Sequence, residues 1–122
     1  MGIDLFLLPI EPDSGEVAYA YTTLDVRRRS ELWEPIRSLP SCPVPSKFFE
    51  TLVSVEDFAD GERWCCGNTQ MDNHGQPLRW VYAKDLKALA AHPAVQDNHQ
   101  NRAVWAYLMQ LPDQTRVALY WY

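Results

Sequence analysis

The sequence predicts one α+β domain over residues 1–122, in which helices cover one face of an antiparallel sheet of three to five strands. Three observations predict this fold class. A length of 122 residues is typical of a single domain. Hydrophobic residues make up 47% and charged residues 22%, which is the balance of a folded globular protein. Segments with the period of a strand and segments with the period of a helix both occur, and no linker separates them.

The N-terminal segment predicts an antiparallel hairpin. Residues 3–10 form an apolar run, residues 17–24 are rich in Tyr and Thr, and Pro12, Asp13 and Gly15 lie between them. Pro presets φ, Asp bonds to nearby backbone and Gly accepts positive φ, so these residues favour a turn. Because residues 3–10 are apolar on both faces, we expect a central strand that is covered on both sides.

The remaining strands and helices are predicted from the periodicity of apolar residues and from the positions of prolines, which interrupt regular structure. Residues 116–122 alternate as a strand does, and we expect this strand to pair beside the first. Residues 78–82 predict a further strand, with Leu78, Trp80 and Tyr82 on one face and Arg79 and Val81 on the other. Helical segments are expected over 28–39, over a turn or two of 46–53, over 83–92 before Pro93, and over 98–111. Three prolines make residues 39–45 extended and irregular.

An acidic cluster follows the second of these helical segments. It contains Glu56, Asp57, Asp60 and Glu62. Ser54 fits an N-cap, and acidic residues in a first helical turn are favoured by the helix dipole. We therefore expect a short helix that ends at Gly61, and helix-end electrostatics accounts for these carboxylates without a metal.

The net charge of −5 makes nucleic acid an unfavourable partner and a basic protein a favourable one. Nucleic acid binding usually needs a basic surplus, and the only basic cluster is formed by Arg27, Arg28 and Arg29. We interpret that cluster as a solvated turn or helix start. The acidic surface indicates a basic protein partner, or else only solubility, and it argues against direct contact with nucleic acid.

The cysteines indicate a reducing compartment. Cys42, Cys65 and Cys66 are odd in number and two of them are adjacent, which is a poor disulfide framework. The first residues lack a basic leader and a cleavage site, and no apolar run is long enough to span a bilayer. We expect a soluble, cytoplasmic protein without a membrane partner, and we expect Cys42 to be a small packed side chain.

One constellation suggests thiol or zinc chemistry. Cys65 and Cys66 precede a polar loop, residues 67–77, that contains Asp72 and His74. Zinc favours thiolate and imidazole ligands, but paired cysteines are usually two to four residues apart, and adjacent residues in a strand point to opposite faces. A small thiol- or zinc-dependent protein that uses these four residues is therefore the alternative hypothesis, and packing of the thiols is the favoured one.

The remaining motifs favour binding over catalysis. The nucleophile-elbow, zinc-protease, P-loop and dinucleotide patterns are missing, so we expect no cofactor and no catalytic residue. Trp80, Trp105 and Trp121 lie on apolar periodic faces and are expected in the core. Trp33 and Trp64 lie near irregular segments and are the better candidates for partial exposure at an interface, but burial in the core is the favoured interpretation of both.

Both ends of the chain resemble small uncharacterised bacterial and phage proteins. The resemblance rests on the opening Met-Gly-Ile-Asp-Leu at residues 1–5. It also rests on the closing helix-turn-strand pattern, at residues 101–108, 111–113 and 117–121. These are packing motifs, so the resemblance implies a bacterial or phage source and no activity.

Together these observations predict a non-enzymatic protein that binds a basic protein partner and inhibits it. An immunity protein or a phage anti-defence protein directed at a nuclease has this character. The contact surface is expected over the acidic segment and the polar loop, at Glu56, Asp57, Asp60, Glu62, Trp64, Asp72 and His74. A homodimeric accessory protein is a third possibility.

Overall fold

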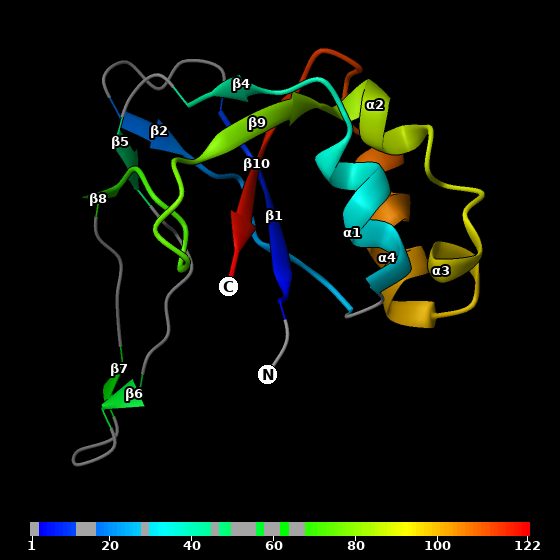
Figure 1. The fold of residues 1–122 in the computed structure, drawn as a ribbon, viewed down its shortest axis with the longest axis horizontal. Helices are drawn as coiled ribbons and strands as arrows, with labels where there is room; N and C mark the ends of the chain where they lie inside the picture. The colour runs from blue at the N-terminus through cyan, green and yellow to red at the C-terminus, as the bar shows by residue number, and fades with distance from the viewer. Residues whose placement is uncertain are drawn as a thin grey trace.

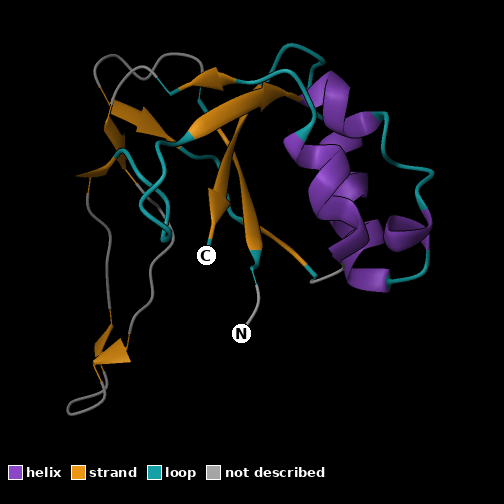
Figure 2. Cartoon of the chain, in the orientation of Figure 1, coloured by secondary structure: helices purple, strands orange, loops and turns teal. Residues whose placement is uncertain are grey.

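A five-stranded antiparallel sheet forms the centre of the fold, with strand order β3-β1-β10-β9-β4. The computed structural model describes residues 3–11, 17–27, 30–44, 47–49, 56–57, 62–63 and 68–122. The strands of the central sheet are β1 (Leu5–Pro9), β3 (Leu24–Val26), β4 (Cys42–Pro43), β9 (Arg79–Tyr82) and β10 (Arg116–Trp121). The helices are α1 (Ser30–Arg37), α2 (Ala83–Lys87), α3 (Pro93–Gln96) and α4 (His99–Met109). Figures 1 and 2 show the four helices gathered on one side of this sheet, as an α+β fold requires.

The first and last strands pair as expected. β1 lies antiparallel to β10, with Leu7 opposite Leu119, and antiparallel to β3, with Leu7 also opposite Leu24. The segment after the first turn is divided, however. It starts as β2 (Val17–Tyr19), continues through a bridge between Ala20 and Ile10, and returns to the central sheet as β3. β2 leaves the hairpin because it pairs in parallel with a distant strand, β5 (Lys47–Phe49).

Both faces of β1 are covered, which explains its continuous apolar run. Leu5 and Leu7 face the helices, and Phe6 and Leu8 face the opposite way. The helix-side core is completed by residues from every helix, including Leu32, Ile36, Leu86, Val95, Val104, Trp105 and Leu108. The opposite core is built around Leu8, Ile10, Ala18, Phe48 and Leu78, under a small sheet of order β2-β5-β8 that ends on β8 (Asn68–Thr69).

The sequence pattern predicted the burial of Trp105 more clearly than that of Trp33. Trp105 is buried as expected, and its Nε1 donates a hydrogen bond to the carbonyl of Leu86 at 2.8 Å. The exposure considered for Trp33 is wrong: its side chain is 7% exposed, and Nε1 donates to the carbonyl of Ile3 at 3.0 Å. A buried indole needs such an acceptor, and α1 supplies the geometry by packing against β1.

Three expectations between residues 42 and 61 are corrected. Cys42 is exposed because β4 lies at the edge of the central sheet, where it pairs with β9. Strand β5 replaces the helical turns expected over 46–53. The acidic helix is replaced by β6 (Glu56–Asp57), which pairs antiparallel with β7 (Glu62–Arg63). Helix signals of a few residues are weak, and strand pairing with other segments overrides them here.

Helices α3 and α4 each begin at an N-cap residue whose side chain accepts a backbone hydrogen bond. Asn98 caps α4, and its side chain accepts a hydrogen bond from the backbone N–H of Asn101 at 3.0 Å. The helix expected over 83–92 ends earlier, at Lys87, and Pro93 begins a new helix, α3, instead of only ending the previous one. Proline suits a first helical position because its missing N–H is not needed there. His92 caps α3, since its Nδ1 accepts from the N–H of Ala94 at 3.0 Å.

Among the described residues, no helix combines the length and the apolar character needed to cross a bilayer.

Candidate functional site

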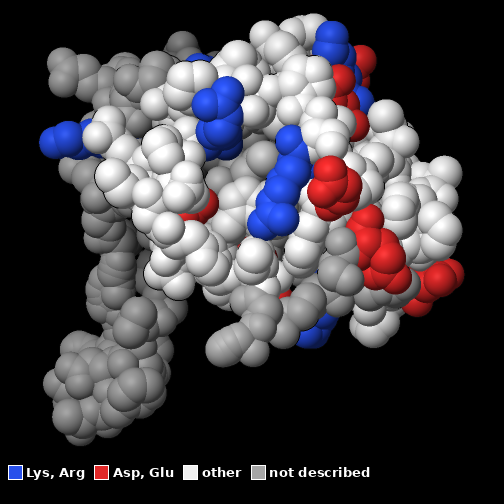
Figure 3. Space-filling model, viewed as in Figure 1, with Lys and Arg blue, Asp and Glu red and all other residues white. Residues whose placement is uncertain are grey.

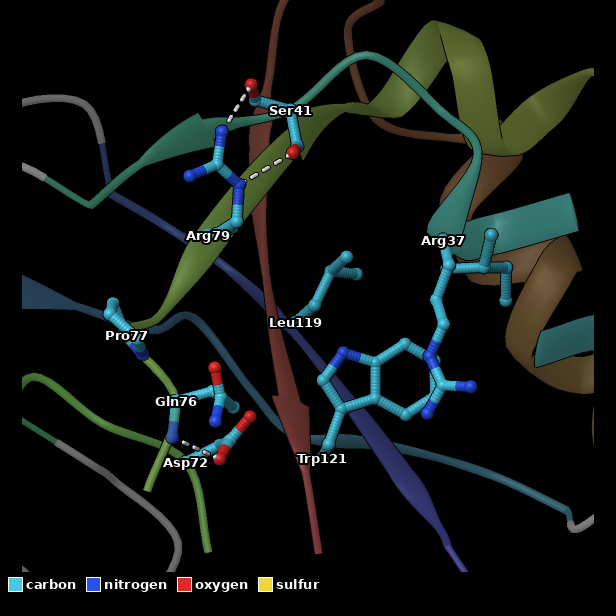
Figure 4. Close-up of a pocket in the computed structure, with 9 residues that line it drawn as sticks. Arg37, Ser41, Asp72, Gln76, Pro77, Arg79, Leu119 and Trp121 are labelled. Carbon is cyan, nitrogen blue, oxygen red and sulfur yellow. Dashed lines mark hydrogen bonds between the residues drawn. The ribbon is translucent and has the colours of Figure 1, made fainter. Parts of the chain in front are cut away.

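A cavity of about 200 Å³ opens on the helix-covered face of the sheet, where the helix layer stops. Alternation along β10 directs Leu119 and Trp121 to this face, and alternation along β9 does the same for Arg79 and Val81. Helix α1 covers part of it and ends at Arg37. The uncovered strip is bordered on its far side by the turn at residues 72–77, as Figure 4 shows.

The floor of the cavity is apolar and held firmly. Trp121 packs edge-to-face on Trp33, with ring centroids 5.5 Å apart and an interplanar angle of 89°. The guanidinium of Arg37 lies 4.5 Å from the centroid of the Trp121 ring, a cation–π contact. Leu119 and Ile36 complete the floor. A rigid indole, enclosed from two directions, gives a ligand a fixed surface to pack on.

Two guanidinium groups line the cavity and differ in how they are held. Arg79 donates from Nε to the Ser41 hydroxyl at 2.7 Å and from Nη2 to the Ser41 carbonyl at 2.9 Å (Figure 4). Arg37 stacks on Trp121 and has no hydrogen-bond acceptor in the described part of the chain. Both side chains are exposed. The donors of Arg37 are therefore available to an acceptor that enters the cavity.

Asp72 organises the turn on the opposite wall. Its Oδ1 accepts hydrogen bonds from the backbone N–H of His74 at 2.8 Å and of Gln76 at 3.0 Å. Gly75 adopts φ of +78°, a left-handed conformation that glycine accepts without strain. The N–H of Asn73 donates to the carbonyl of Trp121 at 3.0 Å, so the turn is fastened to β10.

The second oxygen of Asp72 has a different environment. The side chain is 8% exposed, yet within the described residues no donor reaches Oδ2. Figure 4 shows this oxygen turned away from the turn, toward the space between Gln76 and Trp121. A buried carboxylate oxygen without a partner costs free energy, because it has lost water and gained nothing in return. Such an atom is complementary to a donor on a ligand.

Charged residues of both signs lie on this face. Figure 3 shows a basic area over α1 and β9, and acidic side chains, together with further basic ones, over the helices beside it. Glu34 and Asp97 are exposed acidic residues of this helical region. The basic area coincides with the cavity, so a ligand there meets positive potential with one carboxylate embedded in it.

The structure describes only part of the contact surface expected from the sequence. Asp60 and Trp64 lie outside the described residues, and so do Cys65 and Cys66. The backbones of Glu56, Asp57 and Glu62 lie in β6 and β7. Asp72 lines the cavity, whereas His74 is exposed and contacts Asp72 through its backbone.

Arg37, Arg79 and Trp121 were missed as site residues. One signal was present in the sequence: Arg79 shares a strand face with the apolar Val81, and a charged residue on a buried face often marks a site. No such signal marked Arg37, because its approach to Trp121 depends on how α1 packs on the sheet.

Within the described residues, no group of three or more His, Cys, Asp or Glu side chains is placed to hold a metal ion. The thiol and zinc hypothesis remains a prediction, since both of its cysteines lie outside those residues. Comparison with known proteins adds nothing to this geometry: no family model, curated protein or solved structure matches the chain. The function is therefore argued from the site itself.

Proposed function

We propose that this is a non-enzymatic protein-binding domain, which recognises its partner through the cavity between α1, β9, β10 and the turn at residues 72–77. The observation that carries the proposal is preorganisation. Asp72 is fixed by two backbone N–H groups, Arg79 by Ser41, and Trp121 by its contacts with Trp33 and Arg37. Groups that are already held lose little conformational entropy when a partner binds, so they favour affinity.

The hydrogen bonding in the cavity favours recognition over reaction. The Ser41 hydroxyl accepts a charge-assisted bond from Arg79 Nε, which withdraws electron density from the oxygen and weakens it as a nucleophile. Asp72 Oδ1 already accepts two backbone bonds. A volume of about 200 Å³ is also below the roughly 300–1,000 Å³ of sites that hold drug-sized ligands and cofactors.

The partner that we propose is a basic protein, and the role is its inhibition. The net charge of −5 favours association with a basic surface, and the exposed acidic side chains of the helices lie beside the cavity. A nuclease bound by an immunity protein, or by a phage anti-defence protein, has this chemistry. The bacterial or phage source belongs to the same proposal.

Size-exclusion chromatography with a panel of basic bacterial nucleases tests this function. We expect one nuclease to co-elute with the protein at an ionic strength of about 0.01 M and to bind more weakly at about 0.15 M, where exposed charges are screened. The double variant Glu34→Gln with Asp97→Asn should weaken that complex. Absence of any complex would contradict the proposal, and so would equal binding to every basic protein, including one that is not a nuclease.

A further inference from the structure

We propose that the cavity recognises the carboxyl-terminal residue of the partner chain. In this arrangement the terminal carboxylate binds Arg37, the last main-chain N–H donates to Asp72 Oδ2, and the side chain packs on Trp121. The inference rests on the protein-binding function proposed above and names the group that is bound.

The first step of the argument concerns Asp72. Its side chain is 8% exposed, and Oδ1 is saturated by two backbone N–H groups, so only Oδ2 remains to accept. This oxygen faces the cavity (Figure 4). A ligand that binds there must therefore carry an N–H or O–H donor, and a ligand without one would leave the carboxylate oxygen buried and unpaired.

The second step concerns charge. Two guanidinium groups and one carboxylate line the cavity, so its formal charge is positive. Arg37 keeps its donors free while its flat face rests on Trp121, and a guanidinium binds carboxylates in a planar, paired geometry. A ligand with one negative charge balances the cavity, whereas a lysine or arginine side chain is opposed by both arginines.

The third step concerns size and polarity. About 200 Å³ is room for one residue and not for a nucleotide, and Leu119 and Trp121 offer an apolar floor. A carboxylate, an N–H donor and an apolar side chain on neighbouring atoms are what the last residue of a peptide presents. A free amino acid shares the carboxylate, and its ammonium can donate to Asp72, but the molecule is neutral overall and leaves the formal positive charge of the cavity unbalanced. We therefore assign the site to a peptide end.

Isothermal titration calorimetry with three related probes tests the assignment. N-acetylphenylalanine has the carboxylate, the N–H and the apolar side chain; N-acetylphenylalaninamide lacks the charge; free phenylalanine has an ammonium in place of the amide. We expect N-acetylphenylalanine to bind at least about tenfold more tightly than either of the other probes. A tenfold difference in affinity corresponds to the loss of one charge-assisted hydrogen bond.

Two variants assign the contacts, and a third is their control. Arg37→Gln should weaken binding of N-acetylphenylalanine at least about tenfold. Asp72→Asn keeps an oxygen for the turn but replaces Oδ2 with an N–H donor, so it should also weaken binding while the thermal midpoint stays close to that of the parent. Arg102→Gln removes the same charge from α4, outside the cavity, and should leave binding unchanged.

The outcomes separate this inference from the function on which it rests. No binding of N-acetylphenylalanine, or binding that Arg37→Gln leaves intact, overturns the assignment, even if a nuclease complex forms. Tighter binding of free phenylalanine also overturns it in favour of an amino-acid site. Binding of N-acetylphenylalanine without a complex with any basic protein supports the assignment and contradicts the proposed inhibitor function.

Discussion

Two buried polar side chains, one among the helices and one in the turn at residues 72–77, have very different hydrogen-bond partners. In the described residues, Asn101 and Asp72 are the polar side chains that the fold buries, at 0% and 8% exposure. The Asn101 amide bonds at both ends: Oδ1 accepts from the N–H of Arg27 at 2.7 Å, and Nδ2 donates to the carbonyl of Ala94 at 3.1 Å. By contrast, Oδ1 of Asp72 accepts two backbone hydrogen bonds, whereas Oδ2 accepts none from the described residues.

This difference separates a structural role, that of Asn101, from the binding role that we propose for Asp72. Asn101 joins α4 to α3 and to the segment after β3, and its bonds are complete without any other molecule. Asp72 organises a turn through Oδ1 and presents Oδ2 to a cavity lined with arginines. Buried polar groups are normally paired, so an unpaired oxygen beside open space is complementary to a donor on a ligand.

The largest effect is expected from Asn101→Ala. The change leaves the buried carbonyl of Ala94 and the partly buried N–H of Arg27 without their partners, and it opens a small cavity. We expect the free energy of unfolding to fall by about 2–4 kcal/mol. Urea denaturation measures it, with Gln110→Ala on the exposed end of α4 as the control. A loss under about 1 kcal/mol would show that Asn101 does not hold the helices.

A smaller loss is expected at Asp72, and it should depend on the replacement. Asp72→Ala removes the acceptor of two backbone N–H groups and should cost about 1–2 kcal/mol of unfolding free energy. Asp72→Asn retains that acceptor. Because the two backbone hydrogen bonds are kept, this variant should lose less than about 0.5 kcal/mol of unfolding free energy. The same denaturation experiment checks both. Equal losses for the two variants would mean that the carboxylate matters to the fold as a charge, and the contrast with Asn101 would weaken.

Arg37→Gln should affect stability less than Asn101→Ala or Asp72→Ala. It removes an exposed cation–π contact with Trp121, worth about 0.5–1 kcal/mol. Thermal denaturation followed by circular dichroism measures the change, and Arg102→Gln provides the comparison on α4. A loss of several kcal/mol would mean that Arg37 is part of the structural framework, so its guanidinium would not be free to bind a ligand.

The smallest effect is expected at Asp113, an exposed carboxylate that is paired with Lys87 through Oδ1. The hydrogen bond and the charge of Lys87, at 2.7 Å, lower the pKa of Asp113 below its ordinary value of 3.8. Its contribution to stability is thus present above pH 3.8 and is lost as the pH falls through the lowered value. Asp113→Asn should reduce stability slightly at neutral pH and not in strong acid. Denaturation curves across that range check this, and an equal deficit at every pH would contradict it.

The sequence predicted those parts of the fold whose signals are local. The alternation of residues 116–122, the apolar run of residues 3–10 and the helical pattern of residues 98–111 are local signals, and the structure confirms the strands and the helix that they predict. Strands β5 and β6 were missed because two or three residues carry little periodicity, and their pairing depends on segments elsewhere in the chain.

The cavity was less predictable than the fold. Asp72 was selected from the sequence as part of a polar loop, and the structure adds that half of its carboxylate is committed to the turn. Arg37, Arg79 and Trp121 come from α1, β9 and β10, and only the packing of those elements brings them together. Periodicity places a residue on a face, but it does not say where a helix stops covering that face.

A nitrogen-15 chemical-shift titration with N-acetylphenylalanine tests the central claim most directly. It reports at once on the side-chain amide of Asn101 and on the backbone amides that bond to Asp72. We expect shifts at the amides of His74 and Gln76, which bond to Asp72, and at the indole N–H of Trp121, while the side-chain amide of Asn101 stays unmoved. Shifts that avoid these three groups, or that reach Asn101 equally, would contradict the account.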